Sequence, residues 1–244
     1  MAIVVSSALT AETDSTASNS STTTSGTFNV NANTLYLVAV TVNSQSGTWA
    51  PSGDPTLTGG GASSWVLAAE VESFSSRQVY VFRTSEASPS GAAALTFTAP
   101  GSETYNFLII SAWQVAGATA TGTAGADGVV ATNTATQDQG VSATTSVSAS
   151  PAMTSGNGAV GVFGVYGTSA AVVSVRSGYT NLGNTTIAGN MSHVVIYRAD
   201  TDTAADVTYN SSGGVRAAVF VEVETAAAAA SAGQVVTTYY NHIQ

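Results

Sequence analysis

The sequence contains no cysteine and no lysine, and the few charged residues that it has are mostly acidic. Without cysteine the chain can form no disulfide, zinc–thiolate site, iron–sulfur cluster or thiol nucleophile. The 5 basic residues are all arginine and face 14 acidic ones, which gives a formal net charge of −9. A chain without a basic cluster cannot neutralise a phosphate backbone, so nucleic-acid binding is excluded as a main function. The same charge disfavours attachment to an anionic membrane surface.

Long apolar runs and helical patterns are absent as well. Although 44% of the residues are hydrophobic, no stretch of about 18 apolar residues occurs, so the sequence predicts no membrane-spanning helix. Residues 1–5 have neither the positive charge nor the sustained apolar segment of a secretory signal, and we expect the chain to start in the cytoplasm. Glycine and threonine interrupt any helical periodicity, and Ala226–Ala230 could form barely one turn.

The sequence does contain a series of β-strand patterns, spaced regularly along the chain. Each is rich in β-branched or aromatic residues and bounded by glycine, proline, serine or asparagine. The apolar residues of TLYLVAVTV do not alternate strictly with polar ones, so several strands should be buried on both faces. The clearest patterns are Thr34–Val42, Trp65–Glu72, Gln78–Arg83, Ala94–Ala99 and Asn106–Val115. The predicted fold class is all-β.

An internal repeat relates the two halves of the chain. Arg77–Arg83 (RQVYVFR) aligns with Ser192–Arg198 (SHVVIYR), which pairs Val79 with Val194 and the two final arginines with each other. The matching segments lie about 115 to 125 residues apart, which indicates an internal repeat. The other matching positions are Asn33–Val42 with Asn157–Tyr166, and Trp65 with Tyr179.

Two architectures would accommodate this repeat. The halves could be separate sandwiches of immunoglobulin-like size, or two interlocked Greek-key motifs of one larger jelly-roll-like sandwich. We favour one antiparallel sandwich over residues 27–224, with repeats at about 27–116 and 140–224, because Trp65 and Trp113 both lie in the N-terminal half and leave the other half a thin core. The Ser/Thr-rich residues 1–26 are predicted to form an extended N-terminal arm, and residues 225–244 an alanine-rich spacer and tail.

Residues suited to catalysis are scarce. His193 and His242 are the only histidines, and neither a Gly-x-Ser-x-Gly motif nor a phosphate-binding glycine motif followed by a helix occurs. Two carboxylate pairs have the i, i+2 spacing that places side chains on one strand face, as a glycosidase would need, but such pairs are common on solvated faces. These pairs are Glu70/Glu72 and Glu222/Glu224. We predict that the chain is not an enzyme and that it has neither catalytic residues nor a cofactor.

One acidic segment could bind a metal ion. Asp200, Asp202 and Asp206 alternate with other residues and would supply hard oxygen ligands for calcium. The segment lacks the glycine and the final glutamate of an EF-hand loop, and a solvated hairpin turn explains it better.

Exposed aromatic residues are candidates for recognition. Trp49 lies in a loop pattern and could stack on a host glycan or anchor a subunit contact. Tyr239 and Tyr240 are the next candidates. They belong to the tail Val235–Gln244, whose β-like sequence, beginning with Val235 and Val236, would suit addition to a neighbouring sheet edge or simply a frayed end.

The order of these motifs resembles a known class of proteins. The segments NTLYLVAVTV, LTGGGASSWVLAAE, RQVYVFR and NFLIISAWQVAG, followed by a second, weaker round, resemble β-sandwich structural proteins of tailed bacteriophages, including head decoration (cement) and tail-associated proteins. The resemblance covers roughly Thr27–Glu224. It implies a non-enzymatic role in the virion, assembled in the host cytoplasm, with the major capsid protein or another virion protein as partner. The alternative is a tail-associated or surface adhesin module that binds host glycans.

A homo-oligomer is expected on physical grounds. The absence of lysine removes the usual charged protection of sheet edges, which could then be covered in an assembly. The N-terminal arm (Ala2–Ser25) and the tail (Val235–Gln244) would make the contacts.

Overall fold

A computed structural model describes residues 2–16, 18–44, 53–73, 77–101, 103–137, 140, 142–167, 171–187, 189–210 and 213–227. Within these ranges the chain is built from antiparallel strands and one short 3-10 segment, η1 (Thr123–Gly128), which confirms the all-β prediction. No helix among the described residues is long and apolar enough to cross a membrane.

The N-terminal repeat forms a two-layer sandwich of eight strands. A five-stranded sheet in the order β1-β8-β3-β6-β5 faces a three-stranded sheet in the order β2-β7-β4. The first strand thus lies beside the last and the second beside the seventh, which is the order of a jelly roll. The strands are β1 (Val4–Asp14), β2 (Ser21–Phe28), β3 (Leu35–Ser44), β4 (Thr56–Gly59), β5 (Val66–Ser73), β6 (Arg77–Thr84), β7 (Ala93–Thr98) and β8 (Tyr105–Ala116).

The C-terminal repeat has the same topology. Its five-stranded sheet has the order β13-β14-β11-β16-β9 and its three-stranded sheet the order β10-β15-β12. Adding eight to each strand number of the first repeat reproduces both orders, so the sequence repeat is confirmed strand by strand. The strands are β9 (Val129–Gln137), β10 (Thr144–Ser148), β11 (Gly158–Tyr166), β12 (Val172–Val175), β13 (Thr180–Ile187), β14 (Met191–Arg198), β15 (Ala204–Tyr209) and β16 (Val215–Val223).

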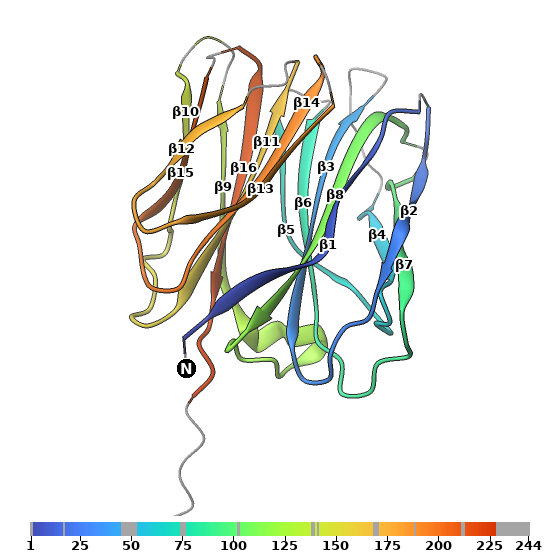
Figure 1. Ribbon diagram of the computed structural model, residues 1–244, viewed down its shortest axis with the longest axis vertical. Coiled ribbons are helices and arrows are strands. Elements are labelled where there is room, and N and C mark those ends of the chain that lie inside the picture. The colour runs from blue at the N-terminus through green and yellow to red at the C-terminus, as the bar shows by residue number, and fades with distance from the viewer. Residues whose placement is uncertain are drawn as a thin grey trace, which may run out of the picture.

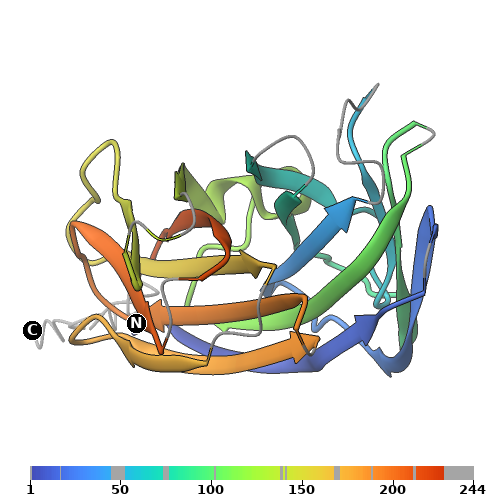
Figure 2. The ribbon, with the colours of Figure 1, turned by 90° about the horizontal axis from the view of Figure 1, so that it is seen from above.

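The two jelly rolls pack face to face through their five-stranded sheets (Figure 1). Seen from above, the yellow-to-red repeat and the blue-to-green repeat lie side by side in Figure 2. Four layers result, with an apolar core inside each jelly roll and a third, central core shared between them. Each sheet takes all its strands from one repeat, so the repeats are not interlocked as we favoured from the sequence. They are not independent either, because both faces of each five-stranded sheet are apolar and each needs a partner layer.

The repeat alignment is right for whole strands but wrong by one residue within β6 and β14. Val79 lies in the central core, whereas Val194, its aligned counterpart, lies in the outer core of the C-terminal repeat. Successive side chains on a strand point to opposite faces, so a shift of one residue exchanges the two faces. Val194 therefore faces the outer core. Its neighbours His193 and Val195 face the central core, as Val79 does.

The predicted N-terminal arm is part of the folded body. β1 pairs along β8 and β2 pairs along β7, and Ile3, Val5 and Leu9 are buried. The sequence analysis missed these strands because serines and threonines lie between the buried apolar residues. These polar residues point to solvent, so the segment has the composition of a loop. The tail prediction, by contrast, falls mostly on residues 228–244, outside the described residues.

Bulges protect several edges of the described sheets without lysine. The ladders at edge strands β1, β5, β13, β2 and β12 all contain register shifts. A bulge twists an edge and disrupts the ladder that an incoming strand would need. The edges β4 and β10 pair without such shifts.

Candidate functional site

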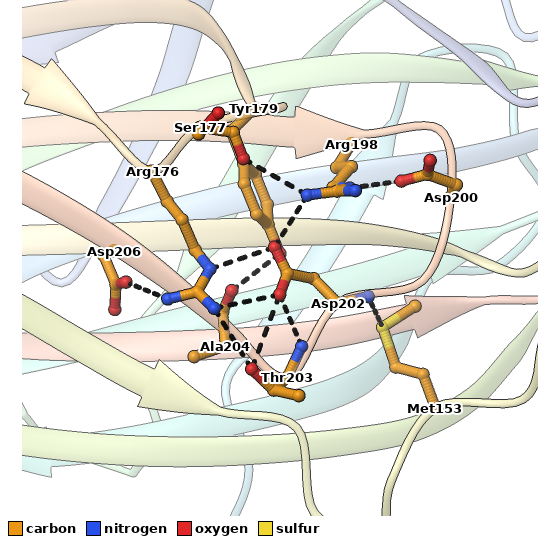
Figure 3. A network of polar contacts seen from close by, with 10 residues as sticks. All are labelled: Met153, Arg176, Ser177, Tyr179, Arg198, Asp200, Asp202, Thr203, Ala204 and Asp206. Atoms are coloured by element: carbon orange, nitrogen blue, oxygen red, sulfur yellow. Dashed lines mark hydrogen bonds and ion pairs between the residues drawn. The ribbon is translucent and has the colours of Figure 1, made fainter.

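One of the polar clusters among the described residues is a charged cluster at one end of the C-terminal repeat. This arginine–aspartate cluster consists of Arg176 after β12, Arg198 at the end of β14, Asp200 and Asp202 in the β14–β15 loop, and Asp206 in β15 (Figure 3). Tertiary structure brings together the three aspartates that the sequence singled out.

Asp202 occupies the centre of the cluster. Arg176 donates two parallel hydrogen bonds to the Asp202 carboxylate, from Nε to Oδ2 at 3.0 Å and from Nη2 to Oδ1 at 3.1 Å. Nη1 of Arg176 donates to Asp206 Oδ2 at 2.7 Å, and Nη1 of Arg198 donates to Asp202 Oδ2 at 2.9 Å. Arg198 also pairs with Asp200 through Nε.

Burial would raise the pKa of Asp202, but hydrogen bonds from Arg176 and the Thr203 N–H, with the two guanidinium charges, hold it below its usual value. The oxygens that would ligate calcium are thus engaged by cations, whereas a calcium ion requires six to eight oxygen ligands of its own. Over the described ranges no group of three or more acidic or histidine residues has a metal-binding arrangement. The geometry is that of an ion-pair network that fixes the β14–β15 loop.

The central position of Asp202 in the cluster predicts that two matched substitutions change the free energy of unfolding by different amounts. Asp202→Asn should lower the free energy of unfolding by about 1 kcal/mol, a value already reduced for the partial exposure of both arginines. Asp200→Asn should change it by less than about 0.5 kcal/mol, since Asp200 is 67% exposed. Urea denaturation at low and high salt measures both, and equal losses would contradict the central role of Asp202.

A cavity lies between the two jelly rolls, at the side where edge strands β1 and β13 meet. This seam cavity has a volume of about 310 Å³. Its lining residues are Ser7, Thr10, Ala11, Trp113, Leu182, Gly183, Asn184, Thr185 and His193.

A buried hydrogen-bonded chain lies beneath the seam cavity and links the repeats. The Nδ1 atom of His193 lies 2.7 Å from Thr41 Oγ1, and its Nε2 atom lies 2.9 Å from Ser111 Oγ. Trp113 donates from Nε1 to Ser111 Oγ at 3.1 Å. A second polar link crosses the central core where Tyr166 donates its hydroxyl to the Gln78 carbonyl oxygen at 2.7 Å.

The Ser111–His193 pair has the spacing of a nucleophile and its base, yet its surroundings do not suit catalysis. Burial lowers the pKa of His193 to about 4, and Ser111 is wholly buried. Both ring nitrogens contact hydroxyl groups, so in the described structure no carboxylate orients the ring as in a catalytic triad. The arrangement instead satisfies polar groups that the central core would otherwise leave unpaired.

The two glutamate pairs differ in their surroundings. Glu70 and Glu72 are exposed on edge strand β5, where partial burial and the charges of Asp54 and Glu72 raise the pKa of Glu70. Glu222 is buried, and its Oε1 accepts hydrogen bonds from the Thr154 N–H at 2.8 Å and from Asn157 Nδ2 at 2.7 Å. Glu222 therefore holds the segment before β11 in place.

Several predicted interface residues lie outside the described residues, namely Trp49, Val235, Val236, Tyr239 and Tyr240. Conversely, sequence reasoning missed the chain of Thr41, Ser111 and Trp113 around His193. The available signal was Ser111, a polar residue within the apolar run NFLIISAWQV.

The comparisons with known proteins add no relative. No family model matches the chain, and neither the curated proteins nor the solved structures contain a match.

Proposed function

We propose that the chain is a non-enzymatic structural protein of a phage virion, a decoration or cement protein that coats the head and binds the major capsid protein. Support comes from the motif order described above and from one feature of the fold. Both ends of the described chain meet at one pole of the four-layer body.

Gly117 marks this pole. It has a φ of +76°, and a Cβ atom at this position would lie 2.4 Å from the Ala2 carbonyl oxygen. The Gly117 carbonyl oxygen accepts a hydrogen bond from the Ala226 N–H at 2.8 Å. Ala2 and Ala226 therefore lie at the same pole of the body. A capsid contact made at this pole would direct the rest of the body's surface outward.

The N-terminal segment takes a different role from the one expected. Since β1 and β2 belong to the sandwich, the capsid contact is assigned to the tail alone, with homo-oligomerisation on the lattice as part of the same proposal. Deletion of residues 2–25 would remove core strands and would not test binding.

The test compares the full chain with a chain that ends at Ala227. Each is mixed with capsids that lack the protein, and the bound fraction is measured by sedimentation, after the solution mass of each has been determined. We expect the full chain to saturate capsids at a fixed stoichiometry and the shortened chain to lose most binding. Equal binding by both would contradict the tail contact. Binding to host cells or glycans, with none to capsids, would favour the adhesin alternative.

A further inference from the structure

We propose that the seam cavity between β1 and β13 is a binding site for a neutral sugar ring. This ligand site goes beyond the proposed capsid role and does not depend on it.

Irregular strands on both sides form the cavity. The pairing of β1 with β8 shifts register between Ser7 and Leu9 and again between Leu9 and Glu12. The pairing of β13 with β14 shifts between Asn181 and Gly183. The extra residues of a bulge do not join the ladder, so their backbone N–H and C=O groups remain to bond a ligand. Two bulged edges that meet across the seam thus provide both the space and the backbone polar groups.

The polar side chains around the cavity are uncharged. Ser7 and Thr10 from β1 and Thr185 from β13 supply hydroxyl groups, and Thr185 pairs with His193 on the central face of its sheet. His193 is neutral near pH 7. A charged ligand would lose its hydration here without meeting an opposite charge. A ligand rich in hydroxyl groups would instead find both donors and acceptors.

The other part of the lining is apolar. Trp113 is almost wholly buried, and Ala11 and Leu182 line the same cavity. A sugar ring has hydroxyl groups at its periphery and apolar C–H groups on its faces, and the lining offers both polar and apolar groups. The volume of about 310 Å³ lies at the lower end of ligand pockets, so it suits one ring better than a chain of rings.

The opposite seam shows that the fold alone does not produce this lining. The corresponding edges β5 and β9 enclose a more open cavity of about 250 Å³, lined by Arg83 and by residues including Leu67, Val129 and Thr132, with no aromatic residue. The same topology therefore carries different chemistry at its two seams.

The test uses the full chain and the methyl glycosides of glucose, galactose, mannose and N-acetylglucosamine. Binding is followed by NMR through the indole N–H signal of Trp113, assigned by its loss in Trp113→Phe. We expect at least one glycoside to bind with a dissociation constant of the order of 1 mM. Thr185→Ala, on an edge strand, should weaken that binding about fivefold, as the loss of one hydrogen bond would. Thr132→Ala, in the opposite seam, should leave it unchanged.

Failure of all four glycosides to shift the signal at about 20 mM would overturn the proposal, as would equal effects of the two alanine variants. Glucuronate and glucosamine serve as charged comparisons, and binding as tight as that of the neutral sugars would also contradict it. An oligosaccharide of the bound sugar distinguishes the source. Tighter binding indicates the terminal residue of a glycan, and equal binding indicates a free sugar. Capsid sedimentation of Thr185→Ala should be normal, which separates this site from the proposed capsid role.

Discussion

Acidification from pH 6.5 to about pH 4 is expected to lower the free energy of unfolding by about 3 kcal/mol through His193 alone. The ring lies buried between the repeats with only hydroxyl partners, so its protonated form would be a buried charge without a counter-charge. In the unfolded chain the ring takes up a proton below its ordinary pKa of 6.5, whereas in the folded chain it does so only below about 4. Between these values the unfolded state binds more protons than the folded state. The free energy of unfolding therefore decreases as the pH is lowered, and the decrease due to His193 levels off below about pH 4.

The two histidines of the chain provide a matched control. Urea denaturation at a series of pH values should show the acid loss in the original chain and in His242→Gln, but not in His193→Gln. Carboxylates with lowered pKa values, such as Asp14 and Asp202, begin to lose their contribution as pH approaches their ordinary value of 3.8, at the acid end of this window, and they do so equally in all three chains. A persistent loss between pH 6.5 and 4 in His193→Gln would contradict the assignment to this residue.

A single charge placed in the central core should strongly lower the free energy of unfolding. Val219 lies in β16, is wholly buried and belongs to the core shared by both five-stranded sheets. Val219→Asp would place a carboxylate among the apolar side chains of the central core. We expect a loss of at least about 4 kcal/mol in the free energy of unfolding, since an unpaired buried charge is among the most destabilising changes.

The matched control is the same substitution at an exposed valine. Val173 is 65% exposed in β12, so Val173→Asp should change stability by no more than about 0.5 kcal/mol. Urea denaturation followed by tryptophan fluorescence measures both variants. Similar losses in the two variants, or a loss below about 1 kcal/mol for Val219→Asp, would show that the central core contributes little.

The sequence by itself determined the class of the fold and the position of its clearest strands. The pattern Gln78–Arg83 became β6 (Arg77–Thr84) and Asn106–Val115 became β8 (Tyr105–Ala116), because dense β-branched and aromatic runs between turn residues have few other stable conformations. The repeat was also readable, since equivalent strands in the two jelly rolls retain similar apolar residues.

Only the tertiary structure decided which face each strand buries and what lies against it. The residues shared by RQVYVFR and SHVVIYR could not show that Val79 and Val194 face different cores. A strand that is buried on both faces has no alternation of apolar and polar residues from which its register could be read. For the same reason the sequence could not place His193 against Thr41 and Ser111, 152 and 82 residues away, or bring Asp202 between Arg176 and Arg198. These contacts join residues distant along the chain, and they follow from the packing of whole sheets rather than from any local pattern.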